Sequence, residues 1–177
     1  PRNQLISVEE MCGKIKAAVE ARDDPDFLII ARSDVVGTVS REEFRKEWLI
    51  DEEIRRSKEY VKAGADAIFT YCLTVDDLKA CVRSINAPLV TLLQEAPNTY
   101  LEHIPTKLFS ELGYKIVISA VGTLFAAAKG VMEGLKAFKE TGHWLTVTEM
   151  GKRIDVEDFW KIINVDKYTP LYKKYSI

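Results

Sequence analysis

Short apolar runs alternate with helical patterns four times along this chain of 177 residues. Each run holds about five residues, mostly Leu, Ile, Val, Phe and Ala, as is typical of strands buried on both faces of a parallel sheet. Strands that alternate with helices over short connections predict right-handed βαβ units. The predicted strands span residues 27–31, 67–71, 89–93 and 115–119, and the predicted helices begin after Ser7 and at Thr74 and span 51–62, 105–112 and 124–139.

The number of strands decides how this sheet is completed. No glycine-rich phosphate loop follows a predicted strand, which argues against a dinucleotide-binding sheet and favours an α/β barrel. A closed (β/α)8 barrel has eight strands and ~250 residues, so four units leave unpaired sheet edges. We therefore expect an α/β fold in which residues 1–142 form part of a TIM barrel. The rest of the barrel would come from sequence outside this chain.

The sequence changes character after Gly142. Asp155 starts another predicted helix, and several aromatic residues follow it up to Tyr175. A terminal segment this rich in aromatic side chains is expected to dock, either on this chain or on a neighbouring subunit. We therefore treat residues 143–177 as a separate C-terminal helical tail.

Composition excludes some classes of function. The net charge of -2 predicts no broad attraction to nucleic acid or to an anionic membrane. No apolar run approaches the ~18 residues of a membrane span. The three cysteines, Cys12, Cys72 and Cys81, have no zinc-ligand spacing and favour a reducing, intracellular compartment. The first residues resemble neither a start methionine nor a signal peptide, so we interpret them as a cut end.

Polar residues follow each predicted strand, where the active site of an α/β barrel lies. The sharpest candidate is Arg32, because a guanidinium offers a rigid fork of donors that fits a carboxylate or phosphate at two points. The structural alternative is an ion pair between Arg32 and Asp34 or another rim carboxylate. The four strand-end groups are Arg32-Ser33-Asp34, Thr70-Tyr71-Cys72, Gln94-Glu95 with Asn98 and Thr99, and Ser119 with Val121-Gly122-Thr123.

Two other strand-end residues have competing interpretations. Glu95 is a candidate acid or base, or a residue that orients Arg32, and its alternative is a solvated loop carboxylate. Tyr71 is a candidate hydrogen-bond donor to an anion, and its alternative is a packed aromatic at the rim. His103 and His143 are isolated in the sequence, and we assign them no chemistry.

Several segments of the sequence resemble the isocitrate lyase and phosphoenolpyruvate mutase superfamily, in the branch that includes 2-methylisocitrate lyase. The likeness extends from about Leu5 to about Gly142, and four segments in the right order and spacing make it specific. The matching segments are SVEEM through KIKAA (7–18), DFLIIARSD (26–34), AGADAIF (63–69) and ELGYKIVI (111–118).

The resemblance implies that this chain supplies strands five to eight of the barrel, followed by C-terminal helices that pack on a neighbouring subunit. It implies a Mg²⁺-dependent lyase, hydrolase or mutase that cleaves or forms a C–C or P–C bond in a small 2-oxo or 2-hydroxy acid through an enolate. It also implies a homotetramer of helix-swapped dimers in the cytoplasm or mitochondria. The metal ligands and a Cys-Gly-His loop are expected upstream of Pro1.

The resemblance also assigns roles to the strand-end residues. Arg32 matches the arginine that grips the substrate's anionic group, and Glu95 matches a glutamate of the strand-seven motif. We name these two as catalytic candidates. The substrate-binding candidates are Arg32, Ser33, Tyr71, Gln94 and Thr99, and no metal ligand is assigned within this chain.

The chain departs from the family pattern at two site positions. Tyr71 stands where a glutamate is usual, and Leu92 stands where an asparagine helps to bind a substrate carboxylate. The segment between Asp34 and Asp51 is also longer than usual, and we expect it to form a rim loop or lid. These departures keep a second hypothesis open, a non-catalytic barrel that acts as an assembly or scaffold subunit. An unrelated aldolase-like barrel is a weaker third, because Lys115 lies at a strand start.

Overall fold

The computed structural model describes residues 4–39, 48–93 and 104–175. The chain divides into two compact units, Pro1–Ala120 and Val121–Ile177. The predicted boundary after residue 142 was drawn where the sequence changes character, not by compactness. The division into a barrel part and a helical tail therefore stays a prediction. Within the described residues, no helix combines the length and apolar character that crossing a membrane requires.

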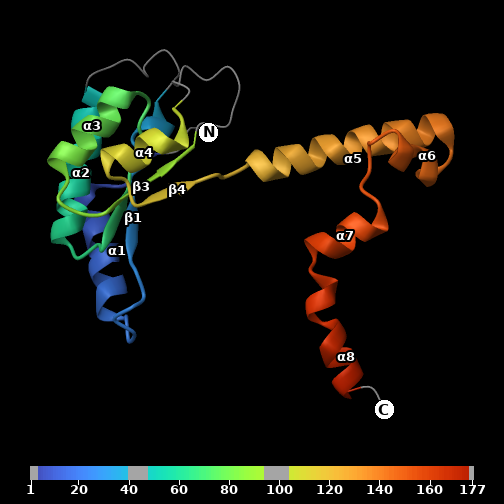
Figure 1. The fold of residues 1–177 in the computed structure, drawn as a ribbon. Coiled ribbons are helices and arrows are strands. Elements are labelled where there is room, and N and C mark those ends of the chain that lie inside the picture. Colours follow the sequence, from blue (N-terminus) through green and yellow to red (C-terminus); the bar gives the residue numbers. More distant parts are fainter. Residues whose placement is uncertain (1–3, 40–47, 94–103, 176–177) are drawn as a thin grey trace. The chain divides into compact units, whose positions relative to one another are not determined.

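The described residues of the first unit form one parallel sheet of four strands in the order β1-β2-β3-β4, accompanied by helices (Figure 1). This confirms the predicted α/β fold with a parallel sheet. Its elements are α1 (Val8–Glu20), β1 (Ile30–Arg32), η1 (Val36–Thr38), α2 (Trp48–Lys62), β2 (Ala67–Phe69), α3 (Val75–Ser84), β3 (Leu89–Leu92), α4 (Thr106–Leu112) and β4 (Ile116–Ile118).

Local chemistry explains where these helices begin and end. The Ser7 side chain accepts a hydrogen bond from the Glu10 N–H at the start of α1, as the sequence predicted. Thr74 and Asp77 form a reciprocal capping box at the start of α3. Gly113 ends α4 with a φ of 100°, a left-handed conformation that favours glycine.

The hydrophobic core lies between the sheet and the helices. Ala31 of β1 and Ile68 of β2 are register partners, and both belong to this core. Neighbouring helices contact one another in chain order, α1 with α2, α2 with α3, and α3 with α4. The helices therefore follow the sheet in the same order as the strands.

Strand β1 departs from the sequence prediction in extent and burial. It begins at Ile30 rather than at Phe27, and it includes Arg32 as its last residue. Only its central residue is buried, because Ile30 and Arg32 point away from the core and are exposed. The expectation that this strand is buried on both faces is therefore wrong for the chain as described.

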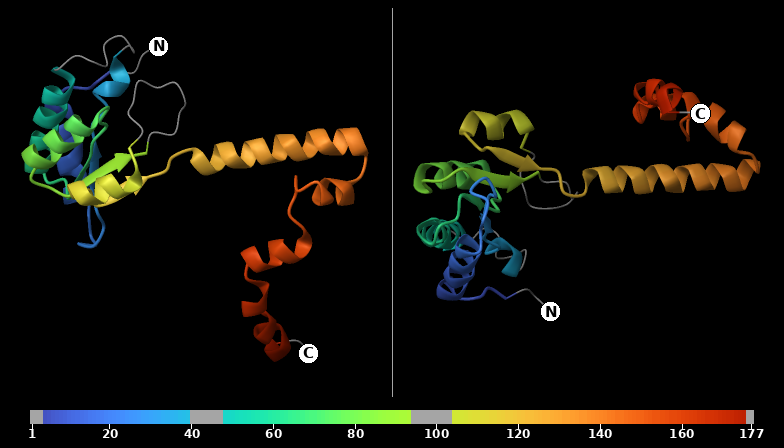
Figure 2. Two further views of the ribbon diagram at one scale, coloured as in Figure 1. Left: turned by 45° about the horizontal axis from the view of Figure 1, so that its top comes forward. Right: turned by 90° about the horizontal axis from the view of Figure 1, so that it is seen from below.

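The described residues of the second unit, 121–175, form helices joined by turns and loops, with α5 as the longest element. Helix α6 lies beside the end of α5 (Figure 2). Gly142 ends α5 in a left-handed conformation with a φ of 71°, and Asp155 caps the predicted helix that follows. Phe138 and Trp144 stack with ring centroids 4.4 Å apart. Its elements are α5 (Gly122–Thr141), α6 (Trp144–Glu149), α7 (Val156–Ile162), η3 (Val165–Lys167) and α8 (Thr169–Tyr175).

Candidate functional site

The carboxyl ends of the strands lie along one edge of the sheet, because all neighbouring pairs are parallel. The hydrogen-bond ladder continues just past the strands. The Ser33 N–H donates to Phe69 O at 3.2 Å, the Thr70 N–H to Val90 O at 3.0 Å, and the Leu93 N–H to Ile118 O at 2.9 Å. The strand-end residues after β1 and β2 are thus held side by side.

Arg32 lies on the exposed side of this edge. Its Nε and Nη2 both donate to Asp34 Oδ1, at 2.9 and 2.7 Å, and its guanidinium lies 4.8 Å from the centre of the Phe69 ring. Phe69 is the register partner of Arg32, which explains the ring contact. The predicted ion pair with Asp34 is therefore present. About half of each side chain remains exposed, 46% for Arg32 and 47% for Asp34, so an anion can still approach the guanidinium.

Tyr71 follows β2 and is half-buried. It packs against Val36 and Leu73, so the predicted packed aromatic is present. Burial raises the pKa of the Tyr71 phenol, with Arg32 opposing the rise and Asp34 adding to it. The phenol therefore carries its proton at neutral pH and keeps the ability to donate a hydrogen bond.

Ser33 points the other way from its two neighbours. Its side chain is buried, at 2% exposure, and its hydroxyl has no hydrogen-bond partner among the described residues. Because side chains alternate between the two faces of an extended segment, Ser33 faces the helix layer while Arg32 and Asp34 stay exposed. The structure therefore does not bring the predicted substrate ligand Ser33 onto the same surface as Arg32.

A buried glutamate, Glu53 of α2, lies behind Ser33, and the sequence analysis missed it. Glu53 is 1% exposed, and burial raises the pKa of its carboxyl to about 8. A usable signal existed, because Leu49, Glu53, Ser57 and Tyr60 recur at helical spacing and all four are buried. A glutamate on the apolar stripe of an amphipathic helix is therefore a candidate functional residue.

Thr70 and Cys72 turn inward from the end of β2. Thr70 Oγ1 lies 3.3 Å from the Tyr114 hydroxyl, and Cys72 Sγ lies 3.6 Å from Cys81 Sγ. The hydrogen bond with Cys72 is the main cause that raises the pKa of the Cys81 thiol, followed by burial. Buried thiols kept neutral in this way pack as small apolar groups rather than act as nucleophiles.

Three predicted site residues, Gln94, Glu95 and Thr99, lie outside the described residues. The proposed contact between Glu95 and Arg32 therefore stays a prediction. Strand β3 itself is present and ends at Leu92, the position at which the resemblance implied an asparagine.

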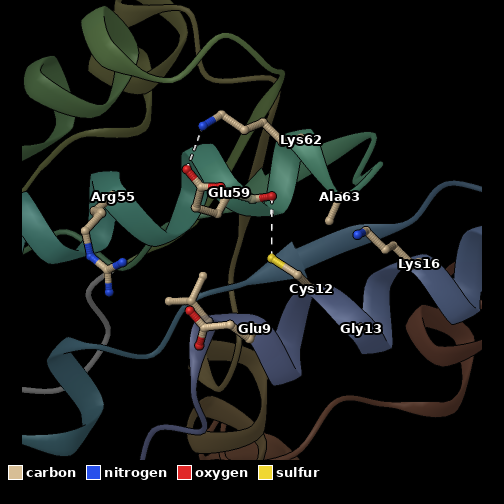
Figure 3. Close-up of a pocket in the computed structure, with 9 residues that line it drawn as sticks. Glu9, Cys12, Gly13, Lys16, Arg55, Glu59, Lys62 and Ala63 are labelled. Carbon is tan, nitrogen blue, oxygen red and sulfur yellow. Dashed lines mark hydrogen bonds and ion pairs between the residues drawn. The ribbon is translucent and has the colours of Figure 1, made fainter.

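A groove of about 640 Å³ lies on the first unit between α1 and α2, and Figure 3 shows its lining. Cys12 Sγ lies 3.6 Å from the main-chain oxygen of Glu59, to which it donates, and Lys62 pairs with the Glu59 carboxylate at 2.7 Å. The groove belongs to the helix layer and contains none of the strand-end residues. Its lining consists of Val8, Glu9, Cys12, Gly13, Lys16, Arg55, Glu59, Lys62 and Ala63.

The described residues do not by themselves fit a magnesium site. They contain no group of three His, Cys, Asp or Glu side chains that could hold a metal ion. The exposed carboxylate nearest in sequence to the candidate site, Asp34, is paired with Arg32. The chemistry that these residues support is the binding of an anion.

A family model described as phosphoenolpyruvate phosphomutase matches residues 1–139. The chain belongs to this family. The match confirms the resemblance to the isocitrate lyase and phosphoenolpyruvate mutase superfamily, and it includes every strand and the ends of β1 and β2 that carry Arg32 and Tyr71.

Curated relatives of this chain include two 2-methylisocitrate lyases. A 2-methylisocitrate lyase of Shewanella oneidensis is 32% identical over 158 residues, which cover 88% of this chain and 50% of that protein. A 2-methylisocitrate lyase of Aeropyrum pernix is 40% identical over 139 residues, 78% of this chain and 41% of that protein. The chain thus spans about half the length of the curated relatives that it matches.

Solved structures of the family agree with the fold. A phosphoenolpyruvate phosphomutase from Streptomyces platensis subsp. rosaceus matches with a TM-score of 0.79 and 26% identity, over 99% of this chain and 57% of that one. A phosphonopyruvate hydrolase in complex with oxalate and Mg²⁺ matches with a TM-score of 0.74 and 26% identity, over 99% of this chain and 58% of that one.

Proposed function

We propose that the complete protein is a lyase, hydrolase or mutase that cleaves or forms a C–C or P–C bond in a small 2-oxo or 2-hydroxy carboxylic acid. The observation that carries the proposal is the half-exposed guanidinium of Arg32 at the carboxyl end of β1, in a member of a family whose relatives are named for such reactions. Arg32 binds the anionic group of the substrate, and Tyr71 donates a hydrogen bond beside it.

Arg32 can exchange its present partner for a substrate at low cost. Exposed ion pairs contribute only about 0–1 kcal/mol, so replacing the Asp34 carboxylate by a substrate carboxylate or phosphonate gives up little. The contact with the Phe69 ring fixes the plane of the guanidinium before the anion arrives. Once it is bound to the substrate, the guanidinium stabilises the negative charge that grows as the C–C or P–C bond breaks.

We further propose that the sheet is half of a barrel, corresponding to its strands five to eight. The support is that β1 and β4 end the sheet and that Ile30 and Ile116 on them are exposed, at 40% and 42%. The other half would complete the sheet and carry the ligands of a Mg²⁺ ion, which the described residues do not supply. A homotetramer through helix-swapped dimers, in the cytoplasm or mitochondria, completes this proposal.

The test uses the complete protein with Mg²⁺ and a panel of isocitrate, methylisocitrate, oxaloacetate, phosphonopyruvate and dimethylmalate. We expect turnover of at least one of them, and Arg32→Lys should reduce it sharply, because a point charge cannot reproduce the fork. Arg83→Lys on the exposed side of α3 is the matched control and should keep full activity. Equal turnover by Arg32→Lys and wild type would remove Arg32 from the mechanism.

The alternative proposal, a non-catalytic scaffold, rests on Tyr71 and Leu92. Tyr71 packs against Val36 and Leu73 and cannot serve as the carboxylate that is usual at its position. This alternative predicts no turnover of any panel member together with a stable oligomer. Turnover of a single panel member would refute it.

A further inference from the structure

One face of the sheet is not used by the hydrophobic core of the first unit. The core takes its strand residues from the other face, among them Ala31, Ile68 and Leu89. Register pairing links Ala31 with Ile68 and Ile68 with Leu89, so these three side chains lie together on the face that the helices cover. Arg32 and its register partner Phe69 therefore belong to the opposite face.

The last residues of the four strands all lie on this opposite face. Arg32 ends β1 and pairs in register with Phe69, which ends β2. Phe69 also pairs with Val90, and Leu92, two positions further along β3, points to the same side. Leu92 in turn pairs with Ile118, the last residue of β4. We call Arg32, Phe69, Leu92 and Ile118 the strand-end face.

The strand-end face has one cation beside three apolar side chains. Arg32 is 46% exposed, and Phe69, Leu92 and Ile118 are half-buried. None of the three apolar residues belongs to the hydrophobic clusters of the described residues, so the helix layer does not use them. Because removing apolar surface from water is favourable, these side chains are suited to contact with hydrocarbon.

The position of the guanidinium sets the reach that a ligand needs. The Arg32 guanidinium lies over the Phe69 ring of β2, 4.8 Å from the ring centre. Neighbouring strands are ~4.8 Å apart, so Leu92 on β3 is about one strand spacing beyond this ring and Ile118 on β4 about two. A short unbranched hydrocarbon tail on an anion bound at Arg32 can therefore contact Leu92, and a slightly longer one can contact Ile118.

We propose that the strand-end face selects a 2-oxo or 2-hydroxy acid with a hydrocarbon substituent, which binds Arg32 through its carboxylate and packs its substituent on Leu92 and Ile118. This inference rests on the proposed function and narrows its substrate class. A substituent that ends in a second carboxylate would lose hydration at Leu92, and the strand-end face offers it no second cation. Leu92 and Ile118 are thus specificity-determining residues.

The location at the strand ends separates this role from core packing. In the proposed barrel, side chains further back along the strands fill the interior, whereas the carboxyl ends of the strands line the active site. Ile30 and Ile116 lie two positions before Arg32 and Ile118 on the same face, and they supply such an interior layer. The strand-end face is the next layer toward the active site, so its apolar members border the ligand.

The test uses the complete protein with Mg²⁺ and four 2-oxo acids of increasing tail length: pyruvate, 2-oxobutanoate, 2-oxopentanoate and 2-oxohexanoate. Calorimetric titration measures each dissociation constant. Every added methylene should lower the Kd by about two- to fourfold, as expected for burial of a methylene group on an apolar surface. 2-Oxoglutarate, which has a charged tail, should bind roughly tenfold more weakly than 2-oxohexanoate.

Three variants connect this preference to the strand-end face. Leu92→Asn and Ile118→Thr introduce polar groups, so each should reduce the ratio of the pyruvate Kd to the 2-oxohexanoate Kd by about fivefold. Leu28→Asn is the matched control. It makes the same change at an exposed position before β1, at the amino end of the sheet, and should keep the wild-type ratio.

The outcomes separate this inference from the proposed function. Equal affinity for the four acids with binding that Arg32→Lys abolishes, or turnover of a panel member without binding of any of the four, would overturn the inference alone. Absence of both binding and turnover would overturn the proposed function as well. If Leu92→Asn does not fold, the wild-type series and Ile118→Thr decide, and an unchanged ratio in Ile118→Thr would contradict the assignment of the tail to the strand-end face.

Discussion

The two sides of the chain at the end of β1 differ in how their charges are compensated. On the exposed side, Arg32 and Asp34 pair at 2.7 Å while about half of each side chain remains in solvent. On the buried side, Ser33 and Glu53 are almost fully enclosed, and Glu53 has no hydrogen-bond partner among the described residues. The exposed pair can change partners at little cost to stability, whereas the buried side couples stability to its protonation state.

The strongest test of this comparison is the pH dependence of stability. The Glu53 pKa rises from 4.5 in an open environment to about 8 in the fold. Below pH 4.5 both the folded and the unfolded states hold the proton, and as pH rises toward about 8 only the unfolded state releases it. The free energy of unfolding should therefore fall over this window, by roughly 3–5 kcal/mol for a shift of this size.

Urea denaturation of wild type and Glu53→Gln between pH 5 and pH 8.5 measures this loss. Wild type should lose stability relative to Glu53→Gln across the window, and Glu59→Gln should follow wild type. If the free energies of unfolding of wild type and Glu53→Gln change with pH in the same way, the Glu53 carboxyl is not held neutral in the fold.

Arg32→Lys tests the exposed side, where function and stability should separate. We expect kcat/KM to fall about 100-fold, which corresponds to about 2.7 kcal/mol, because lysine offers a point charge instead of a fork. The free energy of unfolding should change by less than ~0.5 kcal/mol, since an exposed ion pair contributes little. A large loss of stability together with an unchanged kcat/KM would mean that Arg32 serves the fold rather than the reaction.

Ser57→Ala tests the cost of the unpartnered hydroxyls on the buried side. Alanine removes a buried hydroxyl that has no partner among the described residues and also favours the helix, so the variant should be more stable by about 1 kcal/mol. Ser110→Ala, at an exposed position of α4, measures the helix propensity alone. Equal gains from the two variants would mean that the Ser57 hydroxyl carries no burial cost.

Asp34→Asn should give the smallest effect. Removing the carboxylate frees the Arg32 guanidinium from a competing anion, so the affinity for oxalate should rise by about two- to fivefold. Calorimetric titration against wild type at pH 7 measures it. Weaker binding by Asp34→Asn would instead mean that Asp34 orients Arg32 for the ligand.

The sequence was sufficient for the order and type of most elements, because apolar periodicity and cap residues such as Ser7, Thr74 and Gly113 act over a few neighbours. It also placed Arg32 at a strand end. It missed Glu53, since a pattern analysis treats glutamate as solvent-facing and only the packing of α2 against the sheet buries it. It grouped Ser33 with Arg32 because adjacent residues share a strand end, although they face opposite sides.

Among the residues that the structure describes, the sheet of the first unit ends in β1 and β4, and each presents main-chain donors and acceptors along its outer side. Together with the exposed Ile30 and Ile116, these edges form a template for intermolecular strand pairing. Overproduction of the first unit by itself should therefore yield inclusion bodies and amyloid-type stacking, and a co-translated segment that caps both edges should suppress this. Recombinant yield in the supernatant would then report on edge protection independently of enzyme activity.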